Sequence, residues 1–118
     1  MKYLCLVYAE EQKLDALSKG EFDALVDESL DYMDVLQESG HHIASNALQP
    51  VRTATTVRIR GGKVFTTDGP FAETKEQLGG FFLIEASDLN DALRMASKFP
   101  AAHLGCIEVR PVREMTHS

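Results

Sequence analysis

The sequence of 118 residues lacks several features that would assign it to a class of protein at once. It has no apolar stretch long enough to cross a bilayer, and its first apolar run, Tyr3–Tyr8, is short. No small-residue cleavage site follows that run, so we expect no signal peptide and a cytoplasmic protein without membrane contact. Basic residues are also few, and the net charge of −6 disfavours a nucleic-acid surface.

Cysteine is scarce as well. Cys5 and Cys106 are the only two, and each lies inside an apolar, strand-like run. Such positions predict buried free thiols in a reducing cytoplasm. The two strands would be neighbours in the fold predicted below, so the thiols could approach each other. A structural disulfide would nevertheless conflict with the cytoplasmic interpretation.

The usual sequence motifs for metal and cofactor sites are missing. His41 and His42 are adjacent, so in a strand they point to opposite faces, and His103 and His117 have no ligand partners at a suitable spacing. There is no nucleophile elbow, phosphate loop or dinucleotide fingerprint, since Gly79-Gly80 precedes a strand instead of following one. We therefore expect no metal and no cofactor, and we expect these glycines to permit close backbone approach or a bulge.

Apolar spacing in the remaining sequence predicts two helices. Ser18 and Glu21 form a capping box at the start of the stronger helix, in which apolar residues recur at helical spacing until Gly40. Asp88 is the expected N-cap of the second helix, which ends at Pro100.

Six strands are predicted around these helices. They are β-branched, alternating or doubly apolar runs, and Gly61-Gly62 between two of them is typical of a hairpin. The predicted strands cover residues 3–8, 41–48, 53–60, 63–67, 80–85 and 104–112.

The order strand–helix–strand, hairpin, strand–helix–strand predicts one α+β domain over residues 1–118. This order of elements is typical of a ferredoxin-like sandwich, in which both helices lie on one face of the sheet. Residues 3–8 and 80–85 are apolar on both sides, so the second face of the sheet must also leave water. Two such sheets packed through a two-fold axis would bury that face, which predicts a homodimer.

The segment from Thr67 to Gly80 has the greatest density of turn formers and charges. We expect Asp68 to accept hydrogen bonds from the backbone N–H groups that follow it, with Gly69 and Pro70 completing the turn. Phe71 is the expected apolar anchor. This composition suits a functional loop on a rigid scaffold, although a solvated loop with one cap explains the residue types slightly better. The charged residues after the turn are Glu73, Lys75 and Glu76.

The motif Asp68-Gly69-Pro70-Phe71, with its continuation to Gly80, resembles the DGPF branch of the YCII-related proteins. The likeness extends to residues 1–4, 53–58 and 109–112, and so covers nearly the whole chain. It implies a dimeric α/β barrel of unestablished activity. YCII-type proteins carry a His and an Asp that hint at an enzyme, and those positions fall near Ser29 and Phe99 here, neither of which is ionisable.

Two functions from different classes follow. The first is an enzyme or small-molecule-binding protein in which Asp68, partly desolvated, acts as the acid or base of a pocket. The second is a non-catalytic interaction or regulatory module, because DGPF proteins resemble partners associated with sigma-factor-dependent transcription. An Asp68 that faces a pocket favours the first function, and an Asp68 satisfied by its own turn favours the second. The expected substrate contacts are Tyr8, Phe71, Glu73, Lys75, Glu76 and Arg110, with Tyr8 and Arg110 on one sheet face.

Overall fold

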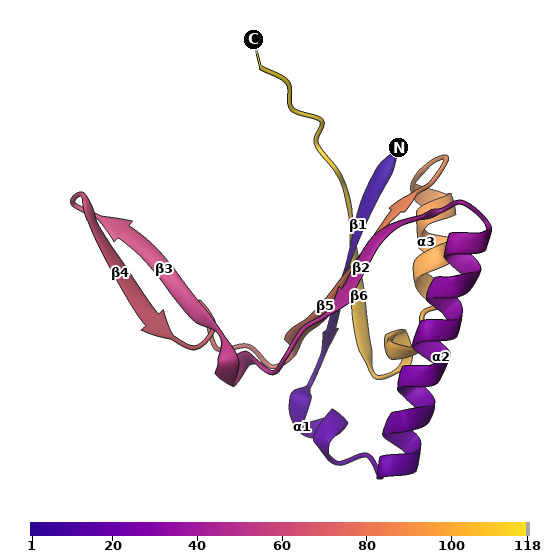
Figure 1. The fold of residues 1–118 in the computed structure, drawn as a ribbon, viewed down its shortest axis with the longest axis horizontal. Helices are drawn as coiled ribbons and strands as arrows, with labels where there is room; N and C mark the ends of the chain where they lie inside the picture. The colour runs from indigo at the N-terminus through magenta and orange to yellow at the C-terminus, as the bar shows by residue number, and fades with distance from the viewer. Residues whose placement is uncertain (118) are drawn as a thin grey trace.

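The computed structural model describes residues 1–117 as a four-stranded antiparallel sheet, helices against one face, and a separate two-stranded arm (Figure 1). The strands are β1 (Lys2–Ala9), β2 (His42–Ala47), β3 (Thr55–Arg60), β4 (Lys63–Asp68), β5 (Gln77–Glu85) and β6 (Gly105–Pro111). The helices are α1 (Glu11–Asp15), α2 (Lys19–Glu38) and α3 (Leu89–Ser97), with 3-10 turns η1 (Val51–Thr53) and η2 (Pro100–His103). Within this range, no helix has the length and apolar character needed to cross a membrane.

The main sheet has the strand order β2-β5-β1-β6, with every neighbouring pair antiparallel. α2 connects β1 to β2, α3 connects β5 to β6, and both helices lie on the same face (Figure 1). This is the ferredoxin-like topology, so the predicted α+β architecture is confirmed. The sequence interpretation differs at three places. Residues 11–15 form α1 instead of a polar turn, η1 delays the start of β3 to Thr55, and β5 begins at Gln77 instead of Gly80.

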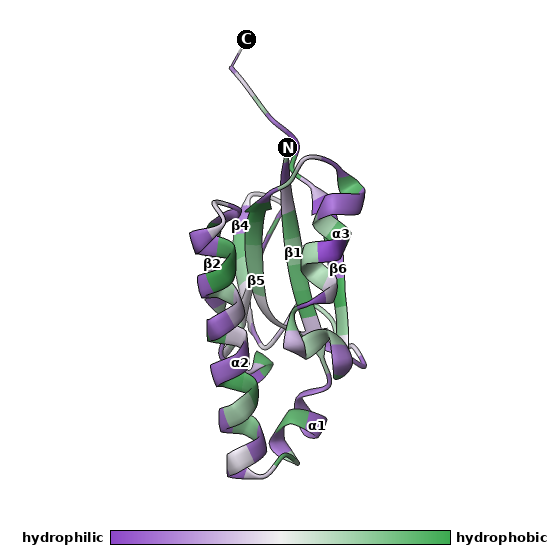
Figure 2. Cartoon of the chain, turned by 90° about the vertical axis from the view of Figure 1, so that its right-hand side faces the viewer, coloured by the Kyte–Doolittle hydropathy of each residue, from purple (hydrophilic) through white to green (hydrophobic). Residues whose placement is uncertain are grey.

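The core lies between the sheet and the helices. Tyr3, Cys5 and Val7 of β1 point into it and are buried, as are Phe82 and Ile84 of β5. Figure 2, seen from the helical side, shows the apolar strands β1 and β5 behind and between α2 and α3. The helices add Met33, Leu36, Ala92, Met95 and Ala96 to this core.

Local signals set the helix ends, as predicted. The hydroxyl of Ser18 accepts a hydrogen bond from the Glu21 N–H at 3.1 Å, while the Glu21 carboxylate accepts one from the Ser18 N–H at 3.0 Å. The capping box is therefore complete. Gly40 follows α2 with a φ of 79°, which glycine adopts without strain. Asp88 caps α3 by accepting a hydrogen bond from the Asp91 N–H at 2.8 Å.

The opposite face of the main sheet, which we call the open face, is left uncovered by the helices (Figure 1). Leu4 and Leu6 of β1 lie opposite Leu83 and Phe81 of β5 on this face, and all four side chains remain partly exposed. Tyr8 belongs to the same face. Both faces of these strands were predicted to be buried. Within one chain, only the face that the helices cover is buried.

The arm consists of β3 and β4, which form a two-stranded sheet of their own. Gly61 and Gly62 have φ values of 57° and 77°, as the primed turn of the predicted hairpin requires. Apart from the half-buried Thr56, every residue of the two strands is exposed. The arm projects on the side of the main sheet opposite to α2 and α3 (Figure 1).

Both expectations for Gly79 and Gly80 are confirmed. Val7 of β1 pairs with Gly80 while the next residue of β1 pairs with Leu78, so Gly79 is the extra residue of a β-bulge. A Cβ on Gly80 would lie 2.9 Å from the carbonyl oxygen of Asn46 in β2, which explains why glycine is needed there.

Candidate functional site

The N-terminal half of α2 extends past the end of the main sheet (Figure 1). Met33 and Leu36 in the other half are buried against the sheet, whereas Phe22, Val26 and Leu30 expose 45%, 39% and 60% of their surface. These residues all recur at helical spacing, but the sheet is too short to cover them all. The first half of the helix therefore presents apolar side chains that lack a complete protein partner.

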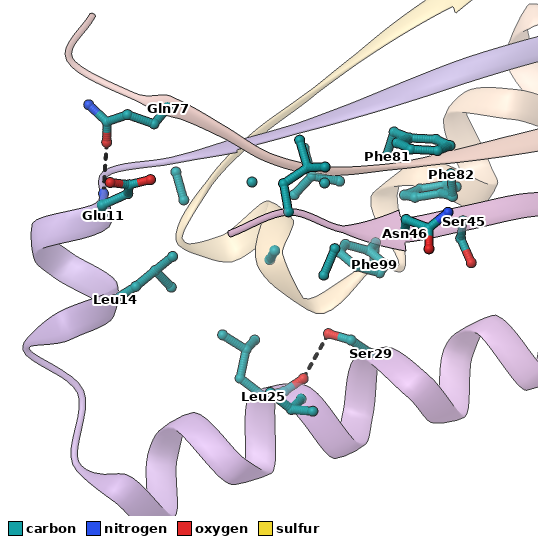
Figure 3. Close-up of a pocket in the computed structure, with 18 of the residues that line it drawn as sticks. Glu11, Leu14, Leu25, Ser29, Ser45, Asn46, Gln77, Phe81, Phe82 and Phe99 are labelled. Carbon is teal, nitrogen blue, oxygen red and sulfur yellow. Dashed lines mark hydrogen bonds between the residues drawn. The ribbon is translucent and has the colours of Figure 1, made fainter. Parts of the chain in front are cut away.

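A groove of about 600 Å³ lies between this half of α2 and the sheet (Figure 3). Leu25 and Val26 of this half line one side, together with Met33 from the second half, and Val7, Phe82 and Phe99 line the other. Its volume falls within the range of roughly 300–1,000 Å³ that is typical of small-molecule pockets. The groove is therefore the candidate binding site.

Few polar groups line the groove, and their free capacity is mostly that of acceptors. The Ser29 hydroxyl donates to the Leu25 carbonyl oxygen at 2.7 Å (Figure 3), so its oxygen can still accept a hydrogen bond. Glu11 and Asp15 add carboxylates near α1. The other polar side chains are those of Asn46, Ser45 and Gln77, and the last two already form hydrogen bonds. The two carboxylates oppose an anion, whereas an apolar molecule with a hydroxyl or amino donor matches this lining.

α1 lines one end of the groove, and two hydrogen bonds hold it there. The Glu11 N–H donates to the side-chain carbonyl of Gln77 at 2.9 Å (Figure 3), and the Val51 N–H donates to the Glu11 carboxylate at 2.9 Å. Glu11 thus joins α1 to both β5 and η1. A five-residue polar segment carries no periodicity that would predict such a helix, so this wall of the groove has no signal in the sequence.

The Asp68 loop lies at the base of the arm and differs from its prediction. Asp68 is exposed, and no group among residues 1–117 donates a hydrogen bond to its carboxylate. The backbone holds the turn instead, because the Gly69 N–H donates to the Ala54 carbonyl oxygen at 2.7 Å and the Thr56 hydroxyl donates to the Gly69 carbonyl oxygen at 2.9 Å. Phe71, the expected buried anchor, exposes 77% of its surface because no element of the same chain packs over it.

The predicted contact residues lie in three places. Tyr8 and Arg110 share the open face, as expected, and Tyr8 pairs with Cys106 across β1 and β6. The Cys106 thiol donates to the Glu76 carboxylate at 3.7 Å, which brings Glu76 near Tyr8. Arg110, farther along β6, forms an ion pair with Glu108.

Lys75 and Glu73 complete that set. The Lys75 ammonium lies 3.8 Å from the Glu10 carboxylate, while Glu73 is exposed. In the described part of the chain, no hydrogen bond or ion pair joins Asp68 to Glu73, Lys75 or Glu76. One chain therefore does not bring these three charged residues together with Asp68.

The YCII-related domain model matches residues 1–116. The chain belongs to the YCII-related family. An uncharacterized protein of Rhizobium meliloti (strain 1021) is 37% identical to this YCII-related protein over 114 residues, which cover 95% of this chain and 92% of the relative.

A solved structure resembles the YCII-related protein in fold. It is the 5-chloro-2-hydroxyhydroquinone dehydrochlorinase of Burkholderia phenoliruptrix AC1100, in complex with 2,5-dihydroxybenzoquinone. The TM-score is 0.56 with 14% sequence identity, and the match covers 98% of this chain and 96% of the other. At this identity the likeness establishes the shared fold alone.

Ser29 and Phe99, the positions matched above to the ionisable pair of YCII-type proteins, both line the groove (Figure 3). The family resemblance thus named two positions that line the groove without indicating a cavity, while the turn motif directed the sequence prediction to Asp68. In this YCII-related chain the two positions hold a hydroxyl and an aromatic ring, and the Phe99 ring centroid lies 5.0 Å from that of Phe82. Across residues 1–117, no three His, Cys, Asp or Glu side chains gather as a metal site.

The two thiols of the YCII-related protein correct the prediction that both are buried. Cys5 is buried in the core, but Cys106 is exposed on the open face, so the sheet separates them although β1 and β6 are neighbours. Burial raises the pKa of the Cys5 thiol to about 12. Desolvation, followed by the Glu76 and Glu108 carboxylates, also raises the pKa of Cys106. Both cysteines are therefore thiols at neutral pH, which disfavours a nucleophilic role.

Proposed function

We propose that this YCII-related protein is a homodimeric small-molecule-binding protein that holds a mainly apolar ligand in the groove. The apolar, 600 Å³ space that α2 leaves beside the sheet is the observation that carries the proposal. Full burial of a side chain such as Phe22 or Leu30 contributes about 1.5–3 kcal/mol relative to water, and a bound apolar molecule recovers part of this.

The lining defines the class of ligand further. Acceptors at Ser29, Glu11 and Asp15 favour a neutral molecule with hydroxyl or amino donors over a carboxylate or phosphate. The Burkholderia structure of the same fold contains 2,5-dihydroxybenzoquinone, and this supports hydroxylated ring compounds as the first probes. Binding is preferred to catalysis because Ser29 and Phe99 supply no acid–base pair, and Glu11 already accepts the Val51 N–H.

The remaining parts of the proposal depend on other features. The partly exposed apolar side chains of the open face support a homodimer in which two sheets close a dimeric α/β barrel across a two-fold axis. The Asp68-Gly69-Pro70-Phe71 motif supports the DGPF branch of the family, and the two free cysteines suit a reducing cytoplasm.

NMR titration of ¹⁵N-labelled protein tests the proposal with a matched pair of probes, 4-propylphenol and 4-propylbenzoate. We expect the phenol to shift the backbone amide resonances of residues 22–33 and 79–82. The dissociation constant of the benzoate should be at least about tenfold higher than that of the phenol. Ser29→Phe fills the groove and should abolish the shifts. Ser39→Phe is the control, because Ser39 also donates its hydroxyl to a carbonyl four residues earlier but lies outside the groove.

Two results would contradict the groove as the site. The first is a set of phenol shifts centred on Asp68 or Tyr8 instead of α2, which would favour a site in the dimer interior. The second is equal binding by Ser29→Phe and the unsubstituted protein.

A further inference from the structure

The arm has two chemically different faces. The register of its six residue pairs places Val57, Ile59 and Val64 on one side, called the apolar face, with only threonines and Asp68 beside them. These three side chains expose 61%, 64% and 66% of their surface. The other side, called the basic face, carries Arg58, Arg60, Lys63 and Phe65.

An isolated two-stranded hairpin is only marginally stable in water, so the arm needs a surface to cover its apolar face. Within residues 1–117 its contacts outside the two strands are limited to the base. There the Ala54–Gly69 and Thr56–Gly69 hydrogen bonds form, and the Arg58 guanidinium donates to the Phe71 carbonyl oxygen at 3.3 Å. The covering surface must therefore come from another molecule.

The position of the arm identifies that molecule. The arm projects on the side of the main sheet that also carries the open face (Figure 1). Any copy of the chain that packs on the open face would lie directly beside it. Resting on the homodimer proposed above, we infer that each arm clasps a second copy of this chain, with its apolar face buried on the partner.

The dimensions are consistent with a clasp. Six residues at about 3.3 Å each give the arm a length of roughly 20 Å, while stacked sheets lie about 10 Å apart. The tip of the arm, Gly61-Gly62, therefore extends past the partner's sheet to the depth of its helices. Arg60 and Lys63 flank this tip, so the positive charge is carried to that layer.

Charge complementarity favours the same partner. No carboxylate of the described chain forms an ion pair with Arg58, Arg60 or Lys63. The protein as a whole has a net charge of −6, and α2 is acidic along most of its length. The tip is where the arm's cations can approach the partner's anions, because the rest of the basic face points away from the surface that the apolar face covers. The α2 carboxylates are Glu21, Asp23, Asp27, Glu28, Asp31, Asp34 and Glu38.

The interface area also argues for the arms. Four strands spaced about 4.8 Å apart and about seven residues long present only about 450 Å². A stable complex buries about 800 Å² on each partner. Two reciprocal arms, each about 20 Å by 10 Å, add roughly 400 Å² to each protomer's share. The open face and the arms together reach the area that a stable dimer needs.

Sedimentation equilibrium tests the clasp with variants that keep strand propensity. Val57→Thr combined with Val64→Thr retains β-branched side chains but removes apolar area. We expect this double variant to raise the dissociation constant of the dimer at least about tenfold. Phe65→Thr is the matched control on the basic face and should change the dissociation constant by less than about threefold.

Cross-linking tests the position of the arm directly, independently of how the substitutions change the stability of the fold or of the dimer. p-Benzoylphenylalanine is placed at Val64, and ¹⁴N- and ¹⁵N-labelled chains are mixed before irradiation. Cross-links between heavy and light chains support the clasp. Cross-links confined to one chain, or unchanged association of the double variant, overturn it while the dimer remains. A wild-type protein that sediments as a 13.1 kDa monomer at millimolar concentration overturns both the homodimer and the clasp.

Discussion

Gly105 provides the sharpest test of the main sheet. The methyl group of an alanine at this position would collide with backbone atoms, which cannot move aside as a side chain can. It begins β6 opposite Ala9 of β1. A Cβ at this position would lie 1.9 Å from the Tyr8 carbonyl oxygen and 2.9 Å from the Ala9 Cα, and both are backbone atoms. The start of β6 and the end of β1 must therefore move apart by about 1 Å or more before these atoms reach normal van der Waals distance.

The expected cost follows from what that separation disturbs. Forcing an extra methyl group into a well-packed site destabilises by about 1–3 kcal/mol. The pairs Ala9–Gly105 and Tyr8–Cys106 are weakened at the same time, and each lost hydrogen bond adds about 0.5–1.5 kcal/mol. We expect Gly105→Ala to lower the free energy of unfolding by about 2–4 kcal/mol.

Equilibrium urea unfolding, at one protomer concentration for every variant, measures this change. Gly20→Ala in α2 is the control: nothing lies within 4 Å of its added Cβ, so the helix should gain up to about 1 kcal/mol. Opposite signs for the two substitutions are the expected outcome. If Gly105→Ala unfolds at the same urea concentration as wild type, the close approach of β6 to β1 is refuted.

Three further outcomes are expected. Hydrogen bonds from the Ser18 backbone and then its side chain hold the pKa of Glu21 below its ordinary 4.5. The stability that they add is present above pH 4.5 and is lost as the pH falls through the lowered value, so Glu21→Gln should flatten that pH dependence in urea melts, whereas Ser18→Ala, which keeps the backbone N–H, should reduce it only in part. DTNB should react with one equivalent per chain, at Cys106, in protein dissociated to monomers, and more slowly in the dimer, which covers the open face; Cys106→Ser should remove the reaction. Leu6→Asp on the open face should give a 13.1 kDa monomer in sedimentation experiments, whereas Val35→Asp on α2, also at an apolar position, should remain a dimer.

The parts of the fold that short sequence segments determine were predictable. Ser18 and Glu21 cap α2 through neighbouring atoms, and Gly61-Gly62 forms a turn whose dihedral angles only glycine adopts readily. The ferredoxin-like order then follows, because helices between antiparallel strands allow few topologies. The cap and the turn need only residues within a few positions of one another, and the topology needs only the order of the elements along the chain.

The groove could not be predicted in this way. Its walls come chiefly from residues 11–15, 22–33, 79–82 and 99–101, and its existence depends on how far α2 extends beyond the sheet. Phe71 could not be placed for the same reason. An aromatic residue after a turn predicts a buried anchor, but its burial depends on distant elements, and none in its own chain covers it. Ser29 was named only through the family resemblance, which identified the position without indicating a cavity.

The unequal support along α2 has a consequence for its motions. The second half of the helix is fixed by Met33 and Leu36, so opening it requires opening the core, whereas the first half is held by its cap and by partial contacts across the groove. Amide hydrogen exchange should therefore be graded along a single uninterrupted helix, fast near Phe22 and slow near Leu36. A molecule that occupies the groove would slow exchange selectively in the first half, so this helix can report occupancy as a difference between its two ends.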